Sequence, residues 1–265
     1  MVNVNIMEVM SGNMQIELDH IYNEDCLVGM KQIPDGSVDA VICDLPYGTT
    51  RNQWDSVIPF DKLWAEYKRI IKRGAPIVLF AQCPFDKVLG CSNIEWLKYE
   101  WIWMKEQGTG GLNSNHQPLK EHENILVFSE YSASPTGQPM TYNPQFEAGK
   151  PYKISRPPKT SDNYNAAAGG TFYNEGKRYP HSIIQFSRDD GGFHPTQKPA
   201  DLLRYLVLTY TNEGDTVLDN CSGSGTTAVA AWREKRHFIC FEKDPVYWEM
   251  SVKRLKNEMM QQRLF

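Results

Sequence analysis

A carboxylate, a proline, an aromatic ring and a glycine stand together in the segment Asp44-Leu45-Pro46-Tyr47-Gly48. The apolar run directly before it predicts a buried strand, which Pro46 and Gly48 would end at once. Ligands of open α/β sheets bind at this carboxyl end of a strand. There, Asp44 and the Leu45 carbonyl could each accept one N–H of an exocyclic amine while Tyr47 stacks on its ring. The same residues also fit a strand-ending turn with a surface aspartate.

A second candidate site is the segment from Asp219 to Thr227, which lies between a predicted strand and a predicted helix. Gly223 and Gly225 would let the backbone approach a ligand closely. Glu242 ends the next predicted strand, where an acid can bind both hydroxyls of a ribose. The order of strand, glycine turn, helix, strand and acid predicts a nucleoside site, whereas the turn alone also fits a structural connection.

The form of this glycine turn indicates which nucleoside it would bind. It reads G-x-G and lacks the third glycine that close packing on a pyrophosphate prefers. Asp219, just before the turn, would repel a phosphate and attract an ammonium group. Both features favour an aminoacyl nucleoside such as S-adenosylmethionine over NAD. An NAD-type oxidoreductase that uses the same turn and Glu242 stays open, although it leaves Asp44 and Tyr47 unexplained.

The composition indicates one large domain, or one domain with an insertion, in a chain of 265 residues of which 41% are hydrophobic. The sequence has no apolar run long enough to span a membrane, and residues 1–14 read as a loose lead-in without signal-peptide features. The six cysteines form no C-x-x-C pair, so we expect neither a metal site nor a disulfide framework. Free cysteines in apolar runs are typical of a reducing cytoplasm.

Basic residues are concentrated in one part of the chain. Residues 150–188 hold seven Lys or Arg and two acids, a net charge of +5 in a chain of −4, so the remainder carries −9. Aromatic residues are interleaved with them. A basic island on an acidic body predicts contact with a polyanion, and a solvated insertion is the alternative. The basic candidates are Lys150, Lys153, Arg156, Lys159, Lys177, Arg178 and Arg188.

Alternating apolar strands and amphipathic helices must position these residues, and this alternation predicts an α/β fold with a mostly parallel sheet. Asp61 is the expected N-cap of a helix over 61–73, and a polar, glycine-rich loop is expected at 105–123. Between 131 and 190 the periodicity disappears. A structureless loop of that length is improbable in a compact domain, so we predict a domain of 15–130 and 191–265 with an insertion at 131–190. The expected strands are 15–22, 38–44, 75–81, 99–104, 124–129, 215–219 and 237–241.

Together the two candidate sites resemble the motifs of the amino-group DNA methyltransferases. Asp44-Leu45-Pro46-Tyr47 resembles their catalytic D/N/S-P-P-Y/F/W motif, and residues 219–225 resemble their D-x-F-x-G-x-G cofactor motif. Residues 194–199 resemble the segment before their extra cofactor-binding helix. The catalytic motif comes first and the cofactor motif last, which is the permuted order of their β class. Leu45 stands where the family has a proline, and the family uses only the backbone carbonyl of that residue, which leucine also has. Cys221 stands where the family usually has a phenylalanine.

This resemblance implies a Rossmann-like methyltransferase fold, with a mostly parallel seven-stranded sheet and one antiparallel strand. It implies methyl transfer from S-adenosylmethionine to an amino group of a base flipped out of double-stranded DNA. The catalytic motif would be Asp44, Leu45, Pro46 and Tyr47, and residues 131–190 would recognise the target. The residues expected to bind the cofactor are Asp25, Thr196, Lys198, Asp219, Cys221, Gly223, Gly225, Thr226 and Glu242.

The family pattern also assigns a role to each main cofactor residue. Asp25 would contact the adenine of S-adenosylmethionine, Glu242 its ribose and Asp219 its methionine end. Thr196 and Lys198 would help to hold its carboxylate. Dimers are common in this family, and the sequence leaves open whether a restriction endonuclease accompanies this protein. The resemblance places the protein in the cytoplasm of a bacterium, encoded by the cell or by a phage.

The head of the catalytic motif favours one target base over another. An aspartate there is typical of adenine N6 enzymes, whereas a serine marks many cytosine N4 enzymes, so adenine is favoured and cytosine N4 is the alternative. Methylation of a cytosine ring carbon needs a Pro-Cys nucleophile, a dipeptide that this sequence lacks. A catalytically idle DNA-binding protein is a third interpretation, which the intact Asp44 and Tyr47 oppose.

Overall fold

The structure is a computed structural model that describes residues 16–49, 55–132, 138–161, 164–167, 169–187, 189 and 197–262. The predicted lead-in 1–14 and the candidates Arg188 and Thr196 lie outside the described residues. The chain divides into two compact units, Met1–Asn143 with Ser182–Phe265, and Pro144–His181.

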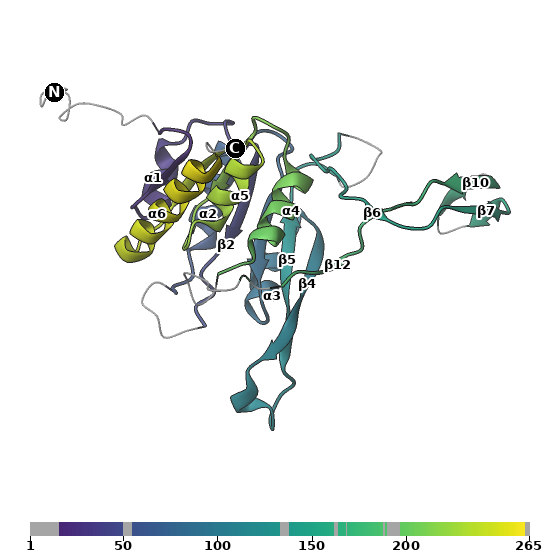
Figure 1. Ribbon diagram of the computed structural model, residues 1–265, viewed down its shortest axis with the longest axis horizontal. Coiled ribbons are helices and arrows are strands. Elements are labelled where there is room, and N and C mark those ends of the chain that lie inside the picture. Colours follow the sequence, from purple (N-terminus) through teal and green to yellow (C-terminus); the bar gives the residue numbers. More distant parts are fainter. Residues whose placement is uncertain are drawn as a thin grey trace, which may run out of the picture. The chain divides into compact units, whose positions relative to one another are not determined.

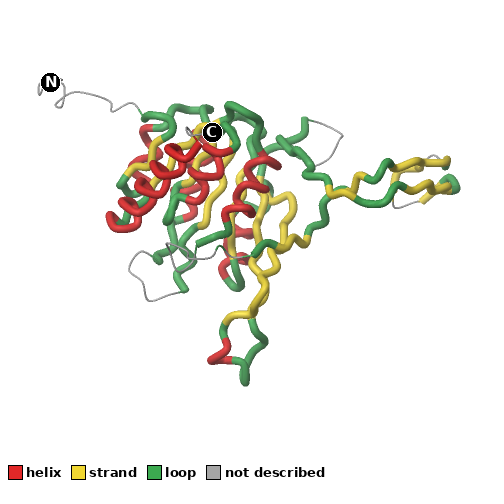
Figure 2. Tube along the Cα trace, in the orientation of Figure 1, coloured by secondary structure: helices red, strands yellow, loops and turns green. Residues whose placement is uncertain are grey.

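The first unit is a sheet with helices on both faces (Figures 1 and 2). Its strands are β1 (His20–Tyr22), β2 (Ala40–Asp44), β3 (Ile77–Ala81), β4 (Leu97–Thr109), β5 (Lys120–Phe128), β12 (Ile183–Gln185), β13 (Thr216–Asp219) and β14 (His237–Phe241). Its helices are α1 (Cys26–Gly29), η2 (Met30–Gln32), α2 (Phe60–Ile70), α3 (Phe85–Ser92), η3 (Gly111–Asn113), α4 (Ala200–Tyr210), α5 (Thr226–Arg233) and α6 (Pro245–Gln262). Across the described residues, no helix is both long and apolar enough to cross a membrane.

The strands are arranged in the order β1-β14-β13-β2-β3-β5-β4-β12. Neighbours pair in parallel except at β5, which runs antiparallel to β3 and to β4. The predicted Rossmann-like, mostly parallel sheet with one antiparallel strand is therefore confirmed. Beyond the seven predicted strands, Ile183–Gln185 adds an eighth beside β4. Three residues are too few for a periodic pattern, which is why the sequence did not indicate this strand.

The sheet is buried on both faces because successive side chains of a strand point to opposite sides. In β3, Val78 and Phe80 pack into the apolar cluster that contains α4, α5 and α6. Ile77 and Leu79 pack into the cluster that contains α1, α2 and α3. All four side chains are fully buried. Burial on both faces explains why these strands read as continuous apolar runs in the sequence.

The centre of the sheet brings the two candidate motifs together. β2 and β13 pair in parallel, and from there the chain continues to β3 on one side and to β14 on the other. A reversal of this kind opens a crevice at the carboxyl ends of the two strands. Asp44 ends β2 and Asp219 ends β13. Both carboxylates therefore lie at the edge where such a sheet binds its ligand.

Two local predictions were wrong. Residues 105–123 are not a loop, because β4 and β5 continue through most of this segment as an antiparallel hairpin that η3 closes. Backbone pairing rather than apolar burial holds that hairpin, so no hydrophobic pattern marks it. Helix α2 begins at Phe60 with Pro59 as its N-cap, so Asp61 lies in the first turn instead. There its negative charge still suits the positive end of the helix dipole.

The second unit, Pro144–His181, lies within the predicted insertion and consists of short antiparallel strand pairs. Every residue of β7, in its longest pair, is exposed, which explains the loss of periodicity in this part of the sequence. The pairs are β6 (Glu147–Ala148) with β11 (Lys177–Arg178), β7 (Tyr152–Arg156) with β10 (Gly170–Asn174), and β8 (Lys159–Ser161) with β9 (Tyr164–Ala167).

Candidate active site

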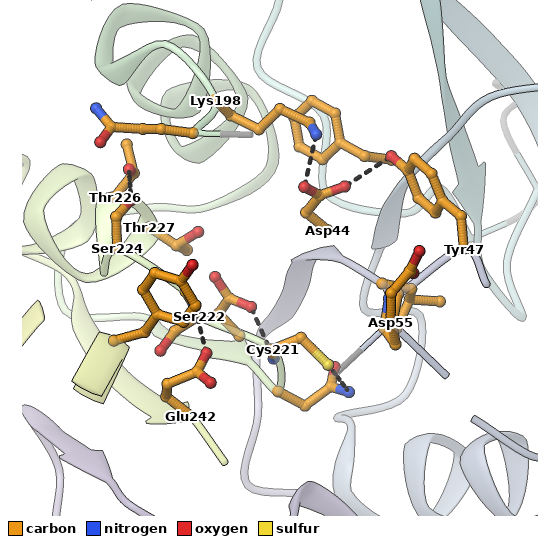
Figure 3. Close-up of a pocket in the computed structure, with 18 of the residues that line it drawn as sticks. Asp44, Tyr47, Asp55, Lys198, Cys221, Ser222, Ser224, Thr226, Thr227 and Glu242 are labelled. Atoms are coloured by element: carbon orange, nitrogen blue, oxygen red, sulfur yellow. Dashed lines mark hydrogen bonds and ion pairs between the residues drawn. The ribbon is translucent and has the colours of Figure 1, made fainter. Parts of the chain in front are cut away.

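A cavity of about 570 Å³ lies at the carboxyl ends of β2, β13 and β14. Residues of both candidate motifs line it, and Figure 3 shows Asp44 and Tyr47 across the cavity from Ser222 and Glu242. The predicted residues that line it are Asp25, Asp44, Leu45, Pro46, Tyr47, Lys198, Asp219, Cys221, Gly223, Thr226 and Glu242. The fold thus gathers into one cavity residues that lie far apart in the sequence.

The Asp44 carboxylate is held by a donor on each oxygen. Tyr47 Oη donates to Oδ1 over 2.7 Å, and Lys198 Nζ lies 2.5 Å from Oδ2. The Tyr47 ring stacks on Phe85 with 5.0 Å between the ring centroids. Burial, with a further contribution from Asp44, raises the pKa of Tyr47 well above its usual value, so its hydroxyl remains a donor. These contacts fix the direction in which Asp44 faces the cavity.

A chain of alternating charges continues from Asp44 into the protein. Lys198 Nζ lies 3.2 Å from Glu123 Oε2, and Glu123 Oε1 lies 2.5 Å from Lys105 Nζ. Burial lowers the pKa of Lys198, but the attraction of Asp44 and Glu123 outweighs it and the net shift is upward. In the same way, the two lysines outweigh burial and lower the pKa of Glu123. Lys198 and Glu123 therefore remain charged at neutral pH.

Three residues of this part of the site were missed in the sequence. Glu123 and Lys105 fell in a segment predicted as a loop, although they line the cavity from β5 and β4. Asp55 also lines it, and its carboxylate accepts the backbone N–H groups of Gly48 and Thr49 over 2.8 and 2.9 Å. Asp55 thereby fixes the turn that follows Tyr47. A single aspartate in a polar segment gave no signal of this role.

The glycine turn on the opposite side is braced by Glu242. Its carboxylate accepts the N–H of Gly223 over 2.7 Å and the N–H of Asp244 over 2.8 Å. Burial raises the pKa of Glu242. Gly225 has a structural role instead. It is the N-cap of α5 and has a φ of +72°, and a Cβ at this position would lie 2.9 Å from Ser251 Cβ. Gly225 therefore allows α5 to pack closely on α6.

Beside the glycine turn, two buried polar residues line the cavity. Asp219 is only 4% exposed, and its Oδ1 accepts the N–H of Cys221 over 3.1 Å. Burial raises the pKa of Asp219 to about 6. Ser222 Oγ is buried and finds no hydrogen-bond partner among the residues that the structure describes. A carboxylate with a raised pKa and an unpaired hydroxyl are features of a site that a polar ligand completes.

The charge of the cavity indicates which ligand that would be. Of the described residues, eight carboxylates and three lysines line it. Such an excess of acids repels a pyrophosphate and attracts a cation. The carboxylates are those of Glu24, Asp25, Asp44, Asp55, Glu123, Asp189, Asp219 and Glu242.

Comparison with known families decides between the enzyme classes that the motifs left open. The sequence model of the DNA methylase family, with N6 and N4 amino-group specificity, matches residues 38–253. This chain belongs to the DNA methylase family. The resemblance to amino-group DNA methyltransferases is thus confirmed, and the NAD-type oxidoreductase interpretation was wrong.

Individual relatives agree with this assignment. The methylase is 25% identical to the Type II methyltransferase M.HindIII of Haemophilus influenzae, over 90% of this chain and 95% of that protein. It is 26% identical to the DNA adenine methyltransferase YhdJ of Escherichia coli, over 90% and 83%. Among solved structures, the M1.HpyAVI–SAM complex matches at a TM-score of 0.58 and 22% identity, over 89% of this chain and 98% of that one. PvuII DNA methyltransferase (cytosine-N4-specific) matches at 0.61 and 16%, over 88% and 85%, and both likenesses show the same fold.

Proposed function

We propose that this methylase transfers a methyl group from S-adenosylmethionine to N6 of an adenine flipped out of double-stranded DNA. The observation that carries this proposal is that Asp44, Tyr47, Asp219 and Glu242 all line one cavity. Asp44 and Tyr47 lie across it from Glu242 (Figure 3). A donor of methyl groups and its acceptor must meet in one place, and this cavity offers a set of residues suited to each.

The cofactor half of the cavity fits S-adenosylmethionine by its chemistry. Bound there, the cofactor would supply a methyl group on a positively charged sulfur. Glu242 would accept the ribose hydroxyls, Asp25 would contact the adenine and Asp219 would pair with the ammonium group. Ser222 Oγ, which has no partner among the described residues, and the excess of carboxylates suit a polar cation. Thr196 remains a predicted partner of the carboxylate, and one structurally similar protein is a SAM complex.

The catalytic half positions the target amine. Asp44 and the Leu45 carbonyl would each accept one of its hydrogens and so direct the nitrogen lone pair toward the methyl group. Tyr47 would stack on the base. The negative charge of Asp44 opposes the positive charge that develops on nitrogen during transfer, which lowers the barrier. Lys198 pairs with Glu123 as well as with Asp44, so its single positive charge does not neutralise the Asp44 carboxylate completely.

The identity of the base rests on Asp44 at the head of the motif, which is typical of adenine enzymes. YhdJ, an adenine methyltransferase by name, is a relative, whereas the structurally similar PvuII enzyme is cytosine-N4-specific. Sequencing of DNA from an expressing host without methylases of its own, with detection of modified bases, tests the proposal. N6-methyladenine at a fixed sequence is expected. N4-methylcytosine would change the base assignment, and unmodified DNA would contradict the proposed function.

Binding of S-adenosylmethionine is expected to weaken as the pH falls below about 6. Burial raises the pKa of Asp219 to about 6 in the free protein. A bound ammonium group favours the ionised carboxylate and lowers the pKa of Asp219. Below the pKa of the free protein, binding must therefore expel a proton, which costs affinity. The ammonium, with an ordinary pKa of roughly 7.7–8.0, stays charged throughout this range. Calorimetry between pH 5 and pH 7 measures the effect.

Asp219→Asn is the control for this pH dependence, because the amide oxygen can still accept the N–H of Cys221. The variant should bind more weakly at pH 7 and show a flatter pH profile. Burial also raises the pKa of Glu242, so some dependence should persist. A profile as steep as that of the wild type would show that Asp219 does not titrate on binding.

The unit Pro144–His181 is proposed to contact DNA and to recognise the target, as part of the predicted region 131–190. Its candidates Lys150, Lys153, Arg156, Lys159 and Lys177 are exposed. Arg178 differs from them, because its guanidinium donates to Asn174 Oδ1 and to the Lys150 carbonyl and lies over the Tyr152 ring. The exposed candidates are therefore the better positioned to bind phosphates.

Replacing Lys153, Arg156 and Lys159 together with glutamine is expected to weaken DNA binding and to flatten its dependence on salt. For each phosphate that is no longer neutralised, the slope of log K against log salt should fall by roughly 0.9. Fluorescence anisotropy with duplex DNA at several salt concentrations measures both quantities.

The matched control removes the same charge elsewhere, by glutamine at Lys31, Lys253 and Lys256, which are exposed in η2 and α6. This control should keep the slope of the wild type. Binding of S-adenosylmethionine should be unchanged in both triple variants. Equal slopes in the two triple variants would place the phosphate contacts outside the unit Pro144–His181.

The wider setting follows from the relatives. Several of them are named Type II methyltransferases and come from bacteria, among them M.HindIII and M.HpaI. We therefore propose a bacterial cytoplasmic enzyme, of the cell or of a phage, that acts beside a restriction endonuclease. From the dimers common among the amino-group DNA methyltransferases, we further propose that it forms a homodimer. Sedimentation of the purified protein, with and without DNA, tests the dimer.

A further inference from the structure

Strands β4 and β5 run on beyond the sheet as a two-stranded arm (Figures 1 and 2). We call residues 105–122 the β4–β5 arm. Its strands pair antiparallel at Met104 with His122 and at Thr109 with Lys120, and η3 closes the end. Most of its described side chains are exposed, so the arm makes little contribution to the core. An exposed element of this length without a core role is a candidate surface for binding a partner.

The end of the arm presents an apolar side chain among amides. Gly110, with φ +90°, and Gly111 turn the chain so that Leu112 is fully exposed, at 102% of its reference area. Leu119 is 45% exposed. Around them stand Asn113, Ser114, Asn115, His116 and Gln117. These side chains donate and accept hydrogen bonds without carrying fixed charge.

The charges of the arm exclude an electrostatic role. The arm holds two lysines, Lys105 and Lys120, and two glutamates, Glu106 and Glu121. Lys105 is also paired with Glu123 at the base, so the arm has no excess of positive charge for phosphates. Amide side chains instead match the edges of bases, which present donors and acceptors in the grooves. Apolar side chains on a protruding element can insert at the step between bases. The composition of the tip therefore fits the bases of a duplex rather than its backbone.

The base of the arm lies at the active site. Trp103 and Lys105 of β4 and Glu123 of β5, at the base of the arm, line the cavity that holds Asp44. From Lys105 to Thr109 a strand advances roughly 13 Å. A flipped base would fill the cavity while its neighbours stay in the duplex outside. An arm that rises from the edge of the cavity therefore reaches those neighbouring base pairs.

We propose that the tip of the β4–β5 arm contacts the bases of the duplex beside the flipped target base. Leu112 packs against the base faces that the flipped base leaves open, and the amides of the tip bond to base edges. This inference rests on the proposed function and adds a base-reading contact to the phosphate contacts of the unit Pro144–His181.

The test compares wild type with Leu112→Ser and with Ile94→Ser, another exposed apolar position, which lies just before the other end of β4. The probe is a duplex oligonucleotide that contains the methylated sequence, with 2-aminopurine as the target base. Leu112→Ser should raise the Kd for the duplex by about tenfold. The fluorescence rise on flipping should then need about tenfold more protein. The salt slope and the affinity for S-adenosylmethionine should not change, and Ile94→Ser should match wild type. A changed salt slope, or an unchanged affinity in Leu112→Ser, would overturn the proposal.

A second measurement uses the unaltered protein. Hydrogen exchange of the backbone amides in residues 105–122 should slow when plasmid DNA is added, and no protection there would overturn the proposal. This readout does not require methylation. A wild-type protein that leaves DNA unmodified would therefore refute the proposed function, while the exchange data would still decide whether the arm meets DNA.

Discussion

Asp44→Ala is expected to lower the rate of methyl transfer by roughly a hundredfold or more, because it removes the preorganised negative charge of the carboxylate beside the reacting nitrogen. The target amine is a poor nucleophile, since its lone pair is delocalised into the ring. Without the carboxylate, one of its hydrogens loses an acceptor and the developing positive charge loses its closest counter-charge. A single-turnover assay with a duplex that contains the methylated sequence measures the rate.

The surroundings of Asp44 make this variant informative. Lys198 would keep Glu123 as a partner 3.2 Å away, so removing Asp44 does not strand a buried charge. S-adenosylmethionine binding should change little, since the other side of the cavity holds it. Asp44→Asn keeps one acceptor oxygen of the same shape and should retain more activity than alanine.

Two outcomes would separate the possible roles of Asp44. A near wild-type rate in Asp44→Ala would show that the catalytic assignment is wrong at its central residue. A large loss of thermal stability would show instead that Asp44 mainly supports the fold. The melting temperature of both Asp44 variants is therefore measured beside the rate.

Glu242→Ala is expected to weaken binding of S-adenosylmethionine by roughly 1–3 kcal/mol, about 5- to 150-fold in Kd. Its carboxylate would bond to the ribose, and it already holds the backbone of Gly223 and Asp244. Alanine removes the ligand contact and loosens the glycine turn at the same time. Calorimetry with S-adenosylmethionine at pH 7 gives the affinity.

Two variants control this result. Glu242→Gln keeps one acceptor and should lose less affinity than alanine. Glu249→Ala removes an exposed acid from α6 and should bind as wild type does. An unchanged Kd in Glu242→Ala would place the ribose elsewhere in the cavity, whereas equal losses in Glu242→Ala and Glu249→Ala would indicate a general effect of charge.

The sequence by itself determined the α/β class and the positions of both motifs. Apolar strands that are buried on two faces leave continuous runs, and the residues that end them, such as Asp44, Asp219 and Glu242, can be located by counting along the chain. A glycine turn is equally local, because the backbone conformation it needs depends on one or two residues. Features of this kind depend on only a few neighbouring residues.

Only the tertiary structure decided what surrounds Asp44. Lys198 reaches it across 154 positions of the chain, and Glu123 and Lys105 complete the charge chain from β5 and β4. Ion pairs of this kind have no sequence period, so nothing in the sequence distinguished Glu123 and Lys105 from solvated charges, and Lys198 was predicted only as a partner of the cofactor. The eighth strand and the β4–β5 arm escaped prediction for a related reason. Backbone hydrogen bonds hold them, and the backbone is the same whatever the side chains are.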